Sequence, residues 1–159
     1  MKKRELIQSI VQQLEMELAV LENAARAAHE AATHAESRAE DSHDTRGLEA
    51  SYLAGAQAKR AAEIKRQIQL IQQLPVREFS ATDAIGLGAC VELQSKGKRS
   101  LFFLVPQGGG MQLPLGEQKV NLISSISPMG EELLGRKEGE RIEVENPGGI
   151  REYIITAIG

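Results

Sequence analysis

The sequence predicts an α+β protein in which a long helical hairpin precedes a small domain built on an antiparallel sheet. Three observations predict this fold class: two heptad stripes of apolar residues, a change of composition at Pro75, and short β-rich segments after it. Residues 1–74 contain no proline and only two glycines, whereas all five prolines follow Leu74. Because a residue before proline is pushed out of the helical region, we predict one domain over 1–74 and a second over 76–159.

Apolar residues in the first half repeat alternately four and three positions apart, which is the a/d spacing of a coiled coil. The two stripes are Ile7, Val11, Leu14, Leu18, Leu21, Ala25, Ala28, Ala32, Ala35 and Ala39, then Ala50, Ala54, Gln57, Ala61, Ile64, Ile68 and Ile71. Small residues of both stripes lie near the middle of the chain, so the stripes match if the chain reverses at 42–47. We predict an antiparallel coiled-coil hairpin, with a long intermolecular coiled coil as the alternative. A helix of about 36 residues would reach about 54 Å.

The second half is typical of short strands joined by turns. Candidate strands are 89–93, 100–105, 120–124, 140–145 and 150–158, and a short helix is predicted at 129–134 after Pro128. No strand is predicted in the glycine-rich stretch 107–116, in which Gly108-Gly109-Gly110 is predicted to be either a flexible loop or a partner-binding loop. Asn146-Pro147-Gly148-Gly149 is a turn signal between the last two strands. About 80 residues of this kind suit a small domain around an antiparallel sheet.

Composition excludes several classes of protein. Only 3% of residues are aromatic and none is tryptophan, which argues against a stacking platform for single-stranded nucleic acid. The net charge of −3 argues against a protein whose main task is to neutralise phosphates. Cys90 is the one cysteine, predicted to be a buried thiol in a reducing compartment. No apolar run approaches the roughly 20 residues that span a bilayer, so we expect a cytoplasmic protein with no membrane partner.

Several motifs follow one another in residues 123–153. They are Ser127-Pro128 ahead of a short helical segment, Leu133-Leu134-Gly135-Arg136, the turn Asn146-Pro147-Gly148-Gly149, and Arg151-Glu152-Tyr153. Their order closely resembles the GreA/GreB transcript-cleavage factors, and the resemblance covers most of residues 85–158. The coiled-coil hairpin is the other half of the same architecture. The resemblance implies an FKBP-like C-terminal domain and a bacterial transcription elongation factor that binds RNA polymerase at its secondary channel.

The resemblance also implies where the protein acts. The C-terminal domain would dock at the rim of the channel, with Ser127, Pro128 and Met129 near the contact. The hairpin would enter the channel, where acids at its tip stimulate cleavage of backtracked RNA by the polymerase. Asp44 and Glu49 are the predicted tip pair, with Asp41 in reserve. The protein would not be an enzyme by itself, and it would have no metal or cofactor of its own.

Carboxylates at the tip suit the chemistry of phosphodiester hydrolysis, which favours two Mg²⁺ ions. Mg²⁺ takes hard oxygen ligands and often only one or two protein carboxylates, so a tip acid would help the polymerase active site retain its second ion. Contact with the 3′ end of the nascent RNA would be indirect, and DNA binding is left open.

Two departures from the family pattern leave alternatives open. GreA-like tips read roughly Gly-Asp-Leu-Lys-Glu-Asn-Ala-Glu-Tyr, and matching both Asp44 and Tyr52 to that pattern requires a one-residue insertion here. Ile126 also replaces the acid usually found before Ser-Pro. A Gre-like regulator that occupies the channel without cleavage is therefore one alternative, and a coiled-coil adaptor protein is another. The basic residues Lys59, Arg60, Lys65 and Arg66 form either a solvated face or a contact with RNA or acidic polymerase surface.

Overall fold

The computed structural model describes residues 3–38 and 46–159, and the side chains within residues 32–54 lie outside its description. The elements are α1 (Lys3–Arg38), α2 (Arg46–Gln72), β1 (Cys90–Ser95), β2 (Lys98–Val105), β3 (Gln112–Leu115), β4 (Gln118–Ser124), α3 (Pro128–Leu133), β5 (Arg141–Asn146) and β6 (Gly149–Ile158). Contacts divide the chain into two compact units, one of which is Val11–Gln69; the other is Met1–Ile10 together with Leu70–Gly159. The predicted domain limits, 1–74 and 76–159, stay predictions.

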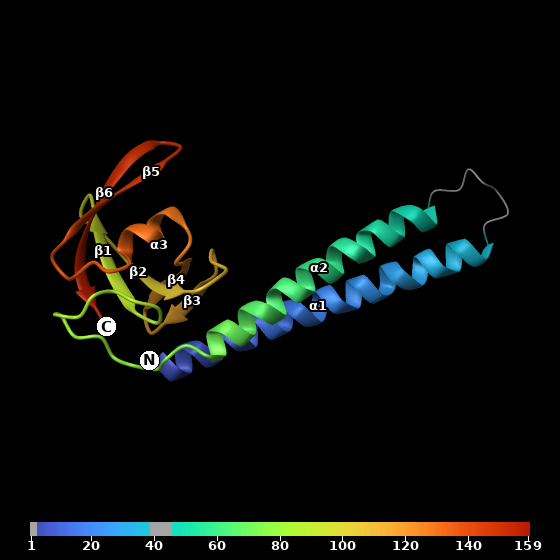
Figure 1. Cartoon of the computed structure of the whole chain (residues 1–159), viewed down its shortest axis with the longest axis horizontal. Helices are drawn as coiled ribbons and strands as arrows, with labels where there is room; N and C mark the ends of the chain where they lie inside the picture. The colour runs from blue at the N-terminus through green and yellow to red at the C-terminus, as the bar shows by residue number, and fades with distance from the viewer. Residues whose placement is uncertain (1–2, 39–45) are drawn as a thin grey trace. The chain divides into compact units, whose positions relative to one another are not determined.

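The unit Val11–Gln69 is a helical hairpin, in which α1 and α2 lie side by side (Figure 1). The predicted stripes meet in its interior, where the buried residues are Val11, Leu14, Ala28, Ala61, Ile64 and Ile68. Ion pairs join the two helices along their flanks, Arg60 to Glu17 at 3.9 Å and Lys65 to Glu22 at 3.0 Å. The predicted packing of two helices from one chain is thereby confirmed. Most of the predicted turn at 42–47 lies outside the described residues.

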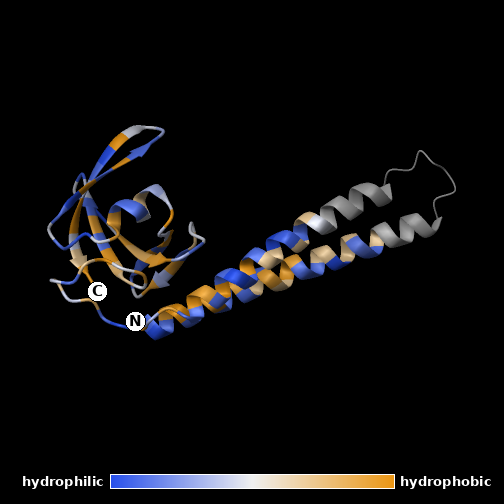
Figure 2. Cartoon of the chain, in the orientation of Figure 1, coloured by the Kyte–Doolittle hydropathy of each residue, from blue (hydrophilic) through white to orange (hydrophobic). Residues whose placement is uncertain are grey.

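Hydrophobic residues concentrate toward the start of α1 and the end of α2, as the orange ribbon of Figure 2 shows. At the start of α1 the buried positions differ from the predicted stripe. Leu6 and Ile10 are 1% and 0% exposed, whereas Ile7 is half-buried. The first turns of α1 belong to the unit that contains the sheet and the end of α2.

The second unit is built on a six-stranded sheet of order β3-β4-β2-β1-β6-β5. Every neighbouring pair is antiparallel except β2 and β4, which run parallel with Phe103 opposite Leu122. The core cluster includes Val91, Leu93, Leu104 and Ile155, and α3 contributes Leu133, which is fully buried. These features confirm the predicted α+β class.

One element of the sheet was not predicted. No strand was expected in residues 107–116, yet Gln112–Leu115 forms β3 and pairs with β4. Leu113 is buried, and Asn121 is held in the register by the side chain of Gln112 at 2.7 Å. Pro114 is compatible with this strand because β3 lies at the edge of the sheet, where a missing N–H leaves no ladder bond unmade.

Candidate functional site

The predicted docking residues lie where β4 ends and α3 begins. Ser127 is the N-cap of α3, and its hydroxyl accepts a hydrogen bond from the Gly130 N–H at 3.1 Å. The same hydroxyl donates to the carbonyl oxygen of Ser124 at 2.6 Å. Pro128 occupies the first helical turn, where its fixed φ suits the helix and its missing N–H leaves no bond unmade. The Ser-Pro pair therefore fixes the direction in which α3 leaves the sheet.

Gly130 makes this arrangement strict. A Cβ atom at this position would lie 1.9 Å from the carbonyl oxygen of Ser124 and 2.9 Å from the Cα of Ser125. Both obstacles are backbone atoms, so no side-chain rotation would relieve the clash. The first turn of α3 can therefore pack this closely on the end of β4 only with glycine at position 130.

The loop before α3 presents apolar atoms to solvent. Ile126 is 68% exposed, Pro128 is exposed, and Met129 is half-buried against the core. The loop itself is held in place, because the hydroxyls of Ser124 and Ser125 both donate to the Pro106 carbonyl, at 3.5 and 3.4 Å. A rigid, partly apolar loop suits a protein contact, because little conformational entropy is lost when a partner binds.

Of the predicted tip acids, the structure describes only the backbone position of Glu49. Asp41 and Asp44 lie outside the described residues. Glu49 lies in the first turn of α2, and its side chain is outside the description. Among the side chains that the structure describes, no group of three or more His, Cys, Asp or Glu residues could hold a metal ion.

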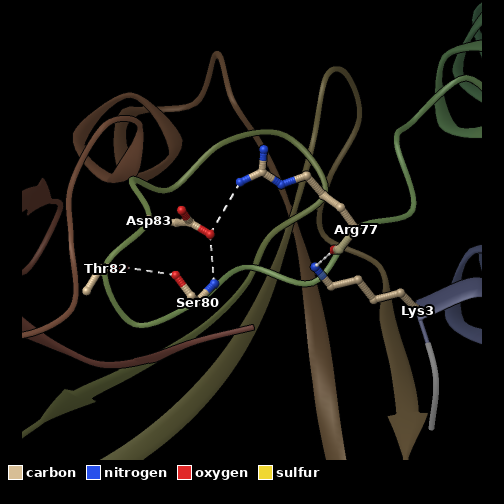
Figure 3. Close-up of polar contacts among 5 residues, drawn as sticks. All are labelled: Lys3, Arg77, Ser80, Thr82 and Asp83. Atoms are coloured by element: carbon tan, nitrogen blue, oxygen red, sulfur yellow. Dashed lines mark hydrogen bonds and ion pairs between the residues drawn. The ribbon is translucent and has the colours of Figure 1, made fainter.

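A cluster of two cations and one aromatic ring was not predicted from the sequence. It joins the first turn of α1 to residues more than 70 positions later, so no local pattern indicates it. The ammonium of Lys3 donates a 2.6 Å hydrogen bond to the Arg77 carbonyl oxygen (Figure 3). The same ammonium lies 4.6 Å from the centre of the Phe79 ring. The Arg77 guanidinium lies 4.1 Å from the same ring. Two cations thus contact one aromatic ring, an arrangement worth about 0.5–2 kcal/mol per pair depending on desolvation.

The loop that follows Phe79 is held by a small polar network. A carboxylate oxygen of Asp83 accepts the Ser80 N–H at 2.8 Å and lies 3.5 Å from the Arg77 guanidinium, as Figure 3 shows. The Ser80 and Thr82 hydroxyls share a 3.1 Å hydrogen bond. These contacts order the segment between the end of α2 and β1.

Electrostatics in this region follow from burial. Lys3 is 6% exposed, and burial lowers the pKa of its ammonium despite the nearby Cys90 and Glu78. Burial likewise raises the pKa of the Cys90 thiol. The thiol is therefore protonated at neutral pH, which makes it a poor nucleophile. The backbone N–H of Ser80 is the main cause that lowers the pKa of Asp83.

No helix within residues 3–38 or 46–159 combines the length and the apolar character needed to cross a membrane.

Comparisons with known proteins give the family. A sequence profile described as "Transcription elongation factor, GreA/GreB, C-term" matches residues 80–159. The transcription inhibitor protein Gfh1 of Thermus thermophilus is 30% identical over 151 residues, which cover 94% of this chain and 90% of that protein. The transcription elongation factor GreA of Syntrophus aciditrophicus is 32% identical over 98 residues, which cover 60% of this chain and 56% of that protein.

A solved structure of GreA factor homolog 1 (Gfh1) from Thermus thermophilus is 26% identical and covers 94% of each chain, with a TM-score of 0.39. The sequence matches settle the family without it, because the Gfh1 similarity runs through the hairpin as well as the sheet unit and the profile spans the whole sheet and α3. This chain belongs to the GreA/GreB family of transcription elongation factors.

Proposed function

We propose that this protein binds RNA polymerase, places its helical hairpin in the secondary channel and inhibits transcription without cleaving RNA. One observation carries the inhibitory role. The similarity to Gfh1, a transcription inhibitor, extends over 94% of the chain, whereas the matched GreA of Syntrophus aciditrophicus covers 60% of it. The hairpin is therefore part of what resembles the inhibitor.

The shape of the hairpin supports entry into a channel. α1 has 36 residues, so at about 1.5 Å per residue it is about 54 Å long. Two helices packed on a thin apolar seam form a stiff rod of small cross-section. Alanines replace the larger seam residues after Leu21, and their small side chains allow the helices to approach more closely there. Charged residues on its flanks, including the pairs Arg60–Glu17 and Lys65–Glu22, keep the rod soluble before it is inserted.

The docking surface proposed for the polymerase is the loop that begins α3. Ser127 and Pro128 fix its backbone, and Ile126 and Met129 supply apolar contact area. An isoleucine in place of the acid that usually precedes Ser-Pro makes this contact less dependent on charge. Binding through this loop should accordingly depend weakly on salt.

Stimulation of RNA cleavage is the second candidate, and the acids Asp41, Asp44 and Glu49 near the predicted reversal favour it. In that mechanism a tip carboxylate would help retain the second Mg²⁺ of the polymerase while another carboxylate orients the attacking water. The protein would remain an accessory factor. Carboxylates on an exposed tip lack the water-excluded, preorganised surroundings that catalysis of this reaction needs.

Backtracked elongation complexes with end-labelled RNA distinguish the two functions. We expect the protein to bind the complex and slow nucleotide addition while releasing no 3′ fragment at any Mg²⁺ concentration. Release of a 3′ fragment that depends on added protein would replace inhibition by cleavage stimulation. If folded protein at micromolar concentration is not retained by core polymerase, both functions fail. Strong self-association would then favour a coiled-coil adaptor protein.

A further inference from the structure

The last strand of the sheet has a free edge. β6 is ten residues long and pairs with β5 from Gly149 to Ile154. On its other side it pairs with β1 only from Ile154 to Ile158, because β1 turns away into β2 after Ser95. Residues Gly149–Tyr153 therefore have a strand on one side only. Figure 1 shows the β5–β6 hairpin extending past the end of β1.

The hydrogen bonds of Ile155 show which edge of β6 each backbone group faces. The Ile155 N–H donates to the Glu140 carbonyl at 2.9 Å, and the Ile155 carbonyl accepts from Gly139 at 2.8 Å. Backbone groups along a strand alternate between its two edges. The N–H and C=O groups of Ile150 and Glu152 consequently point away from β5. Within the described chain, no backbone hydrogen bond reaches them there.

These groups face an open cleft of about 550 Å³ between the β1–β2 turn and the β5–β6 hairpin. The turn contributes Gln94, Ser95, Lys96 and Gly97, and the hairpin contributes Asn146, Gly148, Gly149, Ile150, Arg151, Glu152 and Ile154. The side chain of Ile150 is 71% exposed beside the cleft. Backbone donors, backbone acceptors and one large apolar side chain thus border the same space.

Two cations, Lys96 and Arg151, line the cleft, and Lys98 lies beside it at the start of β2. Lys96, Lys98 and Arg151 are exposed, and none has an ion pair or hydrogen bond from its side chain among the described residues. The acid that lines the cleft, Glu152, is already paired with Arg141 at 2.9 Å. An acidic ligand would therefore gain charge complementarity with the two unpaired cations that line the cleft and with Lys98, which lies opposite Ser95.

We propose that this free edge, Gly149–Tyr153, binds an extended acidic peptide segment of a partner protein, which adds to the sheet as a further strand beside β6. Main-chain hydrogen bonds would supply much of the affinity, and the cations would select acidic side chains. The inference does not depend on binding to RNA polymerase.

Other occupants fit these features less well. Phosphodiesters accept hydrogen bonds but donate none, so a nucleic acid held through its phosphates would not pair with the free carbonyl groups of Ile150 and Glu152, and its base and ribose donors do not repeat at the spacing of a strand. A second copy pairing antiparallel about its central residue would place Arg151 opposite Arg151, and like charges directly opposite are destabilising. Exposed lysines are also a common device against pairing of identical edges.

The probe for the test is an eight-residue peptide of alternating glutamate and valine with blocked ends, added to the ¹⁵N-labelled full chain. We expect the amide signals of Ile150 and Glu152 to shift most and to become protected from hydrogen exchange. The amides of Arg151 and Tyr153, which point toward β5, should gain far less protection. A peptide of the same sequence that is N-methylated at every second residue should bind at least tenfold more weakly, because it lacks donors along one edge.

Matched charge variants complete the test. The double variant Lys96→Glu/Lys98→Glu should weaken binding of the glutamate–valine peptide at least tenfold, whereas Lys119→Glu in β4 should change it less than twofold. If the Ile150 and Glu152 amides show neither shift nor protection at millimolar peptide, the proposal is overturned. Equal binding of the N-methylated peptide would overturn it too, since only charge would then be recognised. Tighter binding of an oligonucleotide, or protection that appears with protein concentration alone, would assign the edge to nucleic acid or to a second copy.

Discussion

The Lys3 ammonium hydrogen-bonds the Arg77 carbonyl oxygen at 2.6 Å, although 74 positions separate the two residues. This contact ties the first turn of α1 to the segment that follows α2, and both belong to the same compact unit. Phe79 is 8% exposed beneath the two cations, so the contact is formed largely out of water. Hydrogen bonds from a charged donor in such surroundings are stronger than those between neutral groups.

Replacing Lys3 should reveal what this contact contributes. In Lys3→Met the apolar stem is kept, but the Arg77 carbonyl loses its donor and the Phe79 ring loses one cation. We expect the free energy of unfolding to fall by about 1–3 kcal/mol. Urea denaturation followed by circular dichroism measures the change. Arg4→Met is the control, because the exposed Arg4 side chain makes no such contact among the described residues, and an equal loss in both variants would contradict this role.

Gly130 and Gly55 form a matched pair of helical glycines. Gly130→Ala would place its Cβ 1.9 Å from the Ser124 carbonyl oxygen, so we expect a loss of about 3 kcal/mol or more in unfolding free energy. Gly55→Ala meets nothing within 4 Å, so replacing a flexible residue in α2 should stabilise the hairpin by about 0.5–1 kcal/mol. Thermal unfolding of both variants compares the two. Near-equal effects would contradict the close approach of α3 to β4.

Ser127 should act through its capping bond. Ser127→Ala removes the acceptor for the Gly130 N–H, and loss of an N-cap typically costs about 1 kcal/mol. Ser127→Thr keeps a hydroxyl and should recover most of that loss. If the α3 loop is the docking surface, polymerase retention should weaken in the alanine variant and recover in the threonine variant. Retention that is unchanged in Ser127→Ala would place the docking surface elsewhere.

Asp83 should make stability sensitive to acid. Its pKa is lowered in the folded state from an ordinary 3.8, mainly by the Ser80 N–H, so the folded form binds fewer protons than the unfolded form near that pH. The stability contributed by Asp83 is present above pH 3.8 and is lost as pH falls through the lower, folded pKa. Asp83→Asn should therefore flatten the fall in denaturation midpoint between about pH 5 and pH 3. Glu117→Gln, which changes an acid outside the network, should leave that slope as it is in the unaltered protein.

Variants of the tip acids should separate the effect on nucleotide addition from binding to RNA polymerase. Asp44→Ala or Glu49→Ala should weaken the effect of the protein on nucleotide addition by at least threefold, because under the proposed function each substitution would remove negative charge near the polymerase Mg²⁺. Retention by core polymerase should stay within about twofold, since the tip and α3 belong to different compact units. Elongation rates and pull-down on the same preparations provide the measurement. If a variant lost its effect on nucleotide addition and its retention by core polymerase to the same extent, the tip residues would act on folding or docking instead.

The division into a helical hairpin and a strand-rich part could be predicted from the sequence, because heptad periodicity, proline placement and turn residues are local signals. The stripe that contains Ile64 and Ile68 is buried as its spacing predicts, and the capping Ser127 follows from a Ser-Pro pair at a helix start. The family motifs around Ser127 could also be recognised in the sequence, because they lie in one continuous stretch.

The tertiary structure alone decided the contacts between distant segments. Nothing near Lys3 in the sequence indicates Arg77 or Phe79 as partners, because burial of an ammonium depends on what packs over it. The β3 strand forms within a glycine-rich stretch because β4 offers an edge to pair with. The free edge of β6 likewise arises because β1 ends at Ser95 while β6 continues, and strand lengths relative to their neighbours are set by the assembled sheet.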